Sequence, residues 1–168
     1  MPSDALALTI VVAGVSTAAA IDVRTRRVPN ALTMSLAGAG LVLATSGLGR
    51  VELIAALAGG LVGLLLMLPG HLLGATGGGD VKLLAATGTL LGPAATLWAF
   101  LVAMIAGGAL ALIVAAHRRR LWLAIRRSAE LVRSAGDNAA EIEDPRADNG
   151  FAYAPAIAVG AILAGVFV

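Results

Sequence analysis

Two aspartates, Asp22 and Asp80, are the residues whose type and position best fit a chemical role. Each borders an apolar stretch: Asp22 directly follows residues 5–21, and Asp80 directly precedes residues 81–92. A charged side chain at the centre of a membrane costs about 2.5–3.5 kcal/mol, and less toward the interface. Two carboxyl groups held within a few Å cannot both ionise easily, so one keeps a proton. The ionised group can then act as a general base on water while the protonated one polarises a carbonyl, without metal or cofactor.

The composition places these aspartates in a membrane protein. Of the 168 residues, 59% are hydrophobic and 13% are charged, and the mean hydropathy is +0.92. Soluble chains average about 45–50% apolar and about 25% charged residues, so disorder, a coiled coil and most soluble enzymes are excluded. The absence of cysteine excludes disulfides, thiolate zinc sites and a cysteine nucleophile. In a membrane chain the net charge of +2 predicts no nucleic-acid partner, because charge position matters more than charge sum.

The scarcity of charge divides the chain into membrane spans. Between residues 31 and 116 the only formal charges are Arg50, Glu52, Asp80 and Lys82. A crossing needs about 20 apolar residues, and Gly92-Pro93 breaks a stretch that is too long for one helix. We therefore predict an all-α membrane protein, a single domain over residues 1–168, with six transmembrane helices at about 5–21, 31–46, 53–73, 81–92, 94–116 and 151–168. The short fourth span needs help from the glycine-rich segment before it.

Loop charges predict the orientation, because arginine and lysine are enriched on the cytoplasmic side. One basic loop follows the first span and another follows the fifth; their arginines are Arg24, Arg26, Arg27, Arg118, Arg119, Arg120, Arg126, Arg127 and Arg133. Six spans put both loops, Asp22 and Asp80 on the cytoplasmic side of the cell membrane, with both termini outside. A cleaved signal peptide is the alternative for the start of the chain, but Asp4 stands where a basic n-region is required.

The segment between the fifth and sixth spans has two parts. Residues 118–135 place arginines on one side of a helical wheel and apolar residues on the other, which predicts an amphipathic helix in the membrane interface. Residues 136–150 carry five acidic side chains and Pro145, which predicts an acidic loop. A topology anchor followed by a solvated linker accounts for both parts.

Structural roles are the alternative for each aspartate. Asp22 could pair with Arg24 or Arg26, and Asp80 could be a helix N-cap. Neither role explains the three glycines, Gly77, Gly78 and Gly79, directly before Asp80. Glycine allows a positive φ or a close approach of backbones, so this segment could receive an extended substrate strand or a neighbouring helix.

These residues resemble a known family. Gly77-Gly78-Gly79-Asp80, followed by Val81-Lys82, resembles the G-x-G-D motif of intramembrane aspartic proteases. Together with the segment from Asp22 to Asn30 and with residues 151–158, it resembles the prepilin (type IV leader) peptidases over nearly the whole chain. The resemblance implies that the basic leader of prepilin-like precursors is cleaved at the cytoplasmic membrane face, with Asp22 and Asp80 as the catalytic pair and no cofactor.

The chain departs from the larger members of that family. Those members carry an added cytoplasmic segment with two cysteine pairs that is associated with N-methylation of the new amino terminus. Here the segment from Asp22 to Asn30 is short and lacks cysteine. The resemblance therefore implies peptidase activity alone, as in the short form of tight-adherence pilus systems and, more distantly, the archaeal preflagellin peptidases.

Four further residues, which the resemblance places near the substrate, could also have purely structural roles. Pro29 favours an extended loop that ends at the second span, and Asn30 could cap that span. Lys82 lies about 200° around a helix from Asp80, so it should reach lipid phosphate or Asp22 instead. Arg24 is first of all a topology determinant.

Other classes of function remain as alternatives. The sequence lacks the serine motifs G-x-S-G and G-x-S-x-G, the zinc motif H-E-x-x-H and a phosphate-binding P-loop, and His71 and His117 stand alone. A small transporter or channel that uses Asp22 and Asp80 as proton or cation sites is the main competitor. In a membrane scaffold, the third class, the glycines would serve helix packing only.

Overall fold

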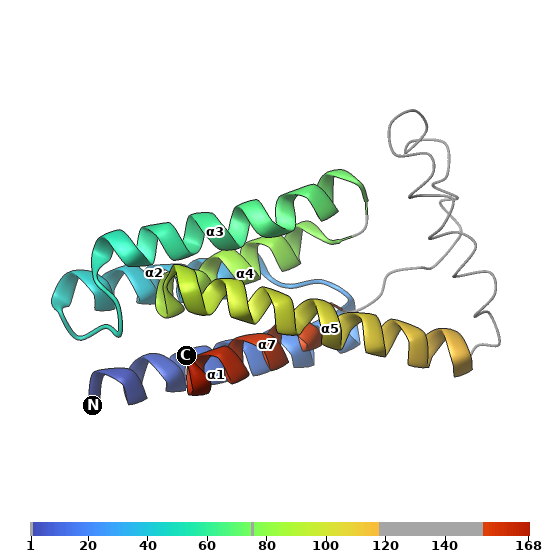
Figure 1. Cartoon of the computed structure of the whole chain (residues 1–168), viewed down its shortest axis with the longest axis horizontal. Helices are drawn as coiled ribbons and strands as arrows, with labels where there is room; N and C mark the ends of the chain where they lie inside the picture. The colour runs from blue at the N-terminus through green and yellow to red at the C-terminus, as the bar shows by residue number, and fades with distance from the viewer. Residues whose placement is uncertain (1, 75, 118–152) are drawn as a thin grey trace. The chain divides into compact units, whose positions relative to one another are not determined.

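The described residues of the computed structural model, 2–74, 76–117 and 153–168, form helices and contain no strand (Figure 1). In chain order the helices are α1 (Pro2–Thr25), α2 (Asn30–Ser46), α3 (Leu53–Leu72), α4 (Gly78–Leu91), α5 (Pro93–His117) and α7 (Ala154–Phe167). The predicted all-α fold is therefore confirmed for this part of the chain. The predicted amphipathic helix 118–135 and the acidic loop 136–150 lie outside the described residues.

Met1–Gly107 and Ala152–Val168 form one compact unit, and Gly108–Phe151 form another. The first unit contains α1 to α4, the first part of α5, and α7. In the second unit the structure describes only the end of α5. All features below belong to the first unit.

Helix α4 lies at the centre of the first unit because it contacts α1, α2, α3 and α7. Most of its 14 residues are buried. Gly88 of α4 faces Gly59 of α3 so closely that a Cβ on either residue would overlap the other's carbonyl group. Small residues of this kind let helix backbones approach in a membrane, where apolar burial drives association less than it does in water.

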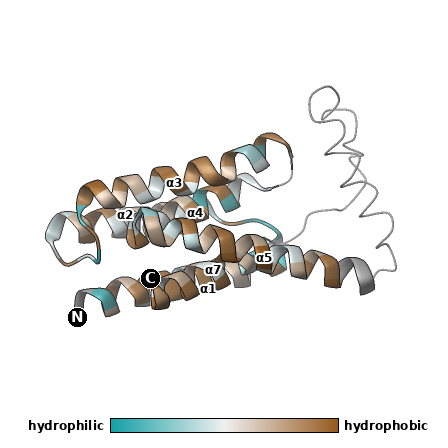
Figure 2. Cartoon of the chain, viewed as in Figure 1, coloured by the Kyte–Doolittle hydropathy of each residue, from teal (hydrophilic) through white to brown (hydrophobic). Residues whose placement is uncertain are grey.

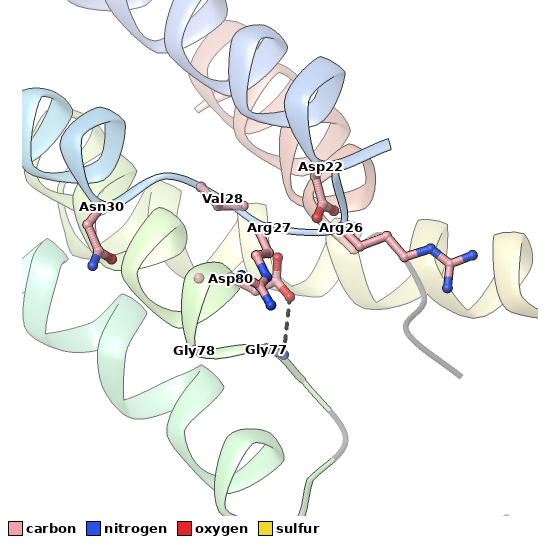
Figure 3. A pocket seen from close by; sticks show the side chains of 9 residues that line it. Asp22, Arg26, Arg27, Val28, Asn30, Gly77, Gly78 and Asp80 are labelled. Atoms are coloured by element: carbon pink, nitrogen blue, oxygen red, sulfur yellow. Dashed lines mark hydrogen bonds between the residues drawn. The ribbon is translucent and has the colours of Figure 1, made fainter. Parts of the chain in front are cut away.

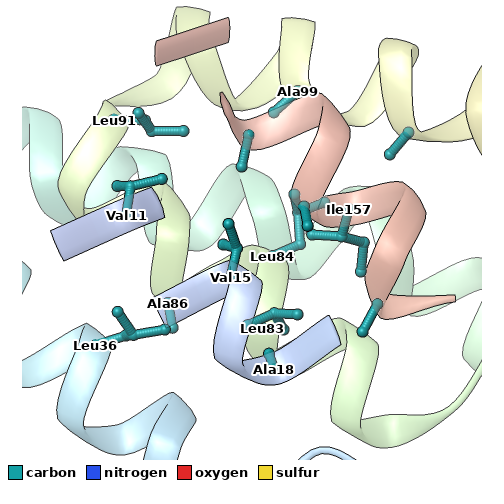
Figure 4. Close-up of a cluster of buried hydrophobic side chains, with 14 of the residues drawn as sticks. Val11, Val15, Ala18, Leu36, Leu83, Leu84, Ala86, Leu91, Ala99 and Ile157 are labelled. Carbon is teal, nitrogen blue, oxygen red and sulfur yellow. The ribbon is translucent and has the colours of Figure 1, made fainter. Parts of the chain in front are cut away.

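The apolar core surrounds α4. Leu83 and Leu84 of α4 are fully buried against Val11 and Val15 of α1 and Ile157 of α7 (Figure 4). Two distant parts of the sequence, the first helix and the last, are thereby packed onto the helix that begins with the glycine-rich motif.

The outer faces of the helices are apolar (Figure 2), with Ile54 of α3 80% exposed and Ile105 of α5 75% exposed. By length and composition, Asp4–Thr25, Leu53–Leu72 and Pro93–Ile113 could each cross a membrane. Asn30–Ser46 and Ala154–Phe167 are shorter apolar helices, and α4 is about 21 Å long. The structure thus supports a membrane protein, and the count of six spans stays a prediction.

The helix break predicted at Gly92-Pro93 is present. Helix α4 ends at Leu91, Gly92 has a φ of 81°, and Pro93 begins α5. Proline is well tolerated in the first turn of a helix because its missing amide hydrogen would have no partner there.

Candidate functional site

A pocket of about 330 Å³ contains both aspartates (Figure 3). Its walls come from the end of α1, the connection to α2, and the start of α4; the lining residues are Asp22, Arg26, Arg27, Val28, Asn30, Gly77, Gly78, Gly79 and Asp80. Asp22 is 5% exposed and Asp80 is 7% exposed. The structure therefore brings together two carboxyl groups that the sequence separates by two whole helices.

Asp22 lies in the last turn of α1 and is held by the last helix of the chain. Its Oδ2 atom accepts a hydrogen bond of 3.1 Å from the backbone N–H of Ala154. Ala154 is the first residue of α7, so this amide has no partner within its own helix. The amino end of a helix carries partial positive charge, which stabilises an ionised carboxylate. The sequence offers the side chains of Arg24, Arg26 and Lys82 as partners of Asp22, and no side-chain pattern reveals this backbone amide.

Asp80 is the third residue of α4. Its Oδ2 atom accepts a hydrogen bond of 3.3 Å from the backbone N–H of Gly77. The N-cap residue of α4 is Gly77, so the alternative that Asp80 is the N-cap is wrong: Asp80 lies three residues later. Instead Asp80 reaches back one turn, as the acidic residue of a capping box does.

The charge state of Asp80 depends on Asp22. Asp80 precedes the predicted span 81–92, and the pKa of its carboxyl is raised from 3.8 to about 6, mainly because the group is buried. The negative charge of Asp22 also raises this pKa, whereas the hydrogen bond from Gly77 lowers it. Like charges in a shared site and desolvation both favour the protonated form of an acid.

The glycines before Asp80 serve close approach. Gly77 has a φ of −71°, and Gly78 and Gly79 are the first residues of α4, so the positive φ considered from the sequence is not used. A Cβ at Gly79 would lie 3.1 Å from the Cβ of Val28, and one at Gly78 would lie 3.4 Å from the His71 ring. The bare backbone of Gly79 therefore lets the α1–α2 connection pack directly against the turn that carries Asp80, whereas a Cβ at Gly78 would make an ordinary contact with His71.

Lys82 and Asn30 meet at the rim of this region. The Nζ atom of Lys82 donates a hydrogen bond of 3.1 Å to Oδ1 of Asn30. The sequence predicts lipid phosphate or Asp22 as the partner of Lys82, and in the structure its partner is Asn30. Pro29, with φ −64° and ψ 134°, is the N-cap residue of α2. The prediction that Asn30 caps this helix is therefore wrong. Its side chain instead accepts the hydrogen bond that links α2 to Lys82 of α4.

The arginines after α1 differ in position. Arg26 and Arg27 line the pocket, whereas Arg24 is an exposed residue of the last turn of α1 and does not line it. Arg26 has a φ of 53°, an uncommon backbone conformation for a residue with a side chain. The sequence predicts that Arg26 and Arg27 determine the topology and offers Arg26 as an alternative partner of Asp22. A row of basic residues does not reveal which ones turn toward a pocket.

Tyr153 is a further residue beside the site. Its hydroxyl donates a hydrogen bond of 3.2 Å to the carbonyl oxygen of Ala103 in α5. The sequence places Tyr153 within the predicted span 151–168, and only Pro155, typical of a helix start, signals that a helix terminus lies here.

Comparison with known proteins gives one match. The family model described as "Type IV leader peptidase family" matches residues 9–112, which include Asp22 and Asp80 and end before α7. No curated protein and no solved structure matches the chain significantly. The family match, together with the long apolar helices, indicates a peptidase that is a multi-pass membrane protein. The matched region covers most of the chain, which therefore belongs to the type IV leader peptidase family.

Proposed function

We propose that this protein is a membrane aspartic endopeptidase that removes the basic leader from prepilin-like precursors, with Asp22 and Asp80 as its catalytic pair. The family supplies the reaction class and the class of substrate. The observation that carries the assignment of residues is the shared pocket, in which two buried carboxyl groups lie close enough for one to raise the pKa of the other.

The surroundings of the two aspartates suggest their roles. Burial and the charge of Asp22 favour the protonated form of Asp80, so Asp80 is the general acid. Asp22, which accepts a hydrogen bond from the N–H at the amino end of α7, is then the general base. One protonated and one ionised carboxyl group in a shared site are the usual basis for such a division of roles.

The reaction then needs only water. Asp22 removes a proton from a water molecule while the water oxygen bonds to the scissile carbonyl carbon. Asp80 gives its proton to the carbonyl oxygen. The resulting tetrahedral diol collapses when the carbon–nitrogen bond breaks. Asp22 passes its proton to the leaving amine, and the diol hydroxyl returns a proton to Asp80. Both carboxyl groups end in their starting states, and no metal or cofactor takes part.

We further propose that the pocket faces the cytoplasm from the inner, or cytoplasmic, membrane of the cell. The chain crosses the membrane six times in this proposal, which puts Arg24, Arg26 and Arg27 on the cytoplasmic side. The short connection from Asp22 to Asn30 has no cysteine-containing segment, so N-methyltransferase activity is not part of the proposed function.

Processing of a precursor in cells tests the catalytic pair. We expect Asp22→Asn and Asp80→Asn each to lower cleavage of a co-expressed prepilin-like precursor by at least about 100-fold, because acid–base groups contribute about 10²–10⁴-fold. Glu52→Gln is the matched control, since Glu52 is an exposed carboxylate before α3 and lines no part of the pocket. Membrane insertion of all variants is checked by their amount in the membrane fraction.

The same variants separate the peptidase from a transporter. Near-normal cleavage by either aspartate variant would exclude the proposed pair. Aspartate-dependent ion flux in proteoliposomes, with no peptide product from the unsubstituted protein, would favour the transporter.

A further inference from the structure

Tyr153 connects α5 to the peptide group that holds Asp22. Its hydroxyl donates a hydrogen bond to the carbonyl oxygen of Ala103, and the next residue, Ala154, donates its N–H to Oδ2 of Asp22. The carbonyl group of Tyr153 and the N–H of Ala154 belong to one planar peptide unit. A displacement of Tyr153 must therefore turn or shift the N–H that the carboxylate accepts.

The Tyr153 ring is also held by the backbone of α5. A Cβ at Gly107 would overlap the ring edge, and it would lie 3.0 Å from Cζ and 3.1 Å from the hydroxyl oxygen. Gly107 is buried, so the ring occupies space that any other residue type at this position would fill. The tyrosine is thus fixed at its hydroxyl and along its ring.

The hydroxyl is the donor in this hydrogen bond. A tyrosine hydroxyl carries its proton at neutral pH, and the Ala103 carbonyl oxygen can only accept.

We propose that Tyr153 is a positioning residue for Asp22: through the peptide group it shares with Ala154, it fixes the carboxylate that acts as the general base. The role of Asp22 as general base in this inference rests on the proposed function. The link from Tyr153 through Ala154 to Asp22 is a property of the structure alone. Nothing in the sequence match suggests the link, because the matched region ends at residue 112.

Kinetics give the first test. Tyr153→Phe keeps the ring and removes only the hydroxyl, so we expect kcat to fall about tenfold while KM stays within about twofold. Displacement of a catalytic group by about 1 Å can cost as much as 10²-fold in rate. A variant that merely lowers stability would instead reduce the amount of folded enzyme, which thermal unfolding in detergent measures. Unchanged kcat in Tyr153→Phe would overturn the proposal.

Nuclear magnetic resonance gives a second test that needs no substrate. Tyr153 is the only tyrosine in the sequence, so ¹³C-carbonyl tyrosine combined with ¹⁵N-alanine labels a single peptide group, that of Tyr153 and Ala154. We expect Asp22→Asn to shift this signal, because the acceptor of the N–H loses its charge. Gly107→Ala, which displaces the ring but retains the tyrosine, should shift the signal in the same direction.

The matched control is Gly38→Ala in α2, where an added Cβ meets no described atom within 4 Å, and it should leave the signal in place. A signal that moves in Asp22→Asn but not in Gly107→Ala would overturn the role of Tyr153. A signal that is indifferent to Asp22→Asn would overturn the Ala154–Asp22 link itself. Absence of cleavage by the unsubstituted protein, with both shifts observed, would remove the proposed function and leave the link standing.

Discussion

At the scale of single residues, the two aspartates are distinguished by their surroundings. Asp22 accepts a hydrogen bond from the backbone N–H of the first residue of α7. Asp80 is a buried carboxyl that accepts a hydrogen bond from the backbone N–H of Gly77. The sequence could identify both residues, because charges are scarce in this chain. It could not assign their roles, since the amide that holds Asp22 is 132 positions away and has no side-chain signature.

The charge of Asp22 should be visible in the titration of Asp80. Asp22→Asn removes a nearby negative charge, so we expect the pKa of Asp80 to fall below about 6. It should stay above the ordinary value, because burial is the larger cause of the increase. Infrared difference spectroscopy of the protonated carboxyl band, followed against pH, measures this shift. An Asp80 pKa that Asp22→Asn leaves unchanged would show that the two groups are not coupled.

Activity should depend on pH through the same group. A general acid must be protonated, so cleavage should be favoured below the raised pKa of Asp80 and should decline as pH rises through about 6. The pH dependence of kcat for the unsubstituted protein in liposomes checks this. A rate that rises steadily through this range would contradict the role of Asp80 as acid.

At the scale of helices, α4 packs against α1, α2, α3 and α7, and its first turn places Asp80 in the pocket that Asp22 also lines. The break at Gly92-Pro93 could be predicted from the residues, because proline and glycine act locally. The central position of α4 could not be predicted, because glycines occur both where helices pack tightly and in flexible loops. The contact between Gly59 and Gly88 shows which use applies here.

Gly88→Ala should therefore destabilise the protein. The added Cβ would lie 2.6 Å from the backbone carbonyl carbon of Gly59, and overpacking of this kind costs about 1–3 kcal/mol. Gly38→Ala is the opposite case, because open space lets alanine gain about 0.5–1 kcal/mol over glycine in a helix. Thermal unfolding in one detergent compares the two. Equal unfolding temperatures for both variants would show that α3 and α4 do not approach so closely.

At the scale of the whole molecule, the charge pattern along the sequence predicted a multi-pass membrane protein, and the helices and the family match support it. Charge counting works at this scale because the energetic cost of charge in lipid is large and additive along the chain. Long-range pairing, such as that of α7 with α1, follows from side-chain packing that no count of charges contains.

The orientation in the membrane can be tested with single cysteines, since the chain has none of its own. Helix α3 separates two exposed loop positions, Leu48 and Leu73, by about 30 Å of helix. We expect Leu73→Cys to react with an impermeant maleimide only from the cytoplasmic side, and Leu48→Cys only from the other side. The reverse pattern would place the pocket on the wrong face of the membrane.

The central claim is that Asp22 and Asp80 together hydrolyse a leader peptide bond. The most direct measurement is the rate at which purified protein in liposomes cleaves a prepilin-like precursor, compared among the unsubstituted protein, Asp22→Asn, Asp80→Asn and Glu52→Gln at equal folded amounts. We predict that Glu52→Gln keeps the full rate and that each aspartate variant loses at least about 100-fold. Cleavage by either aspartate variant at a rate close to that of Glu52→Gln would contradict the account.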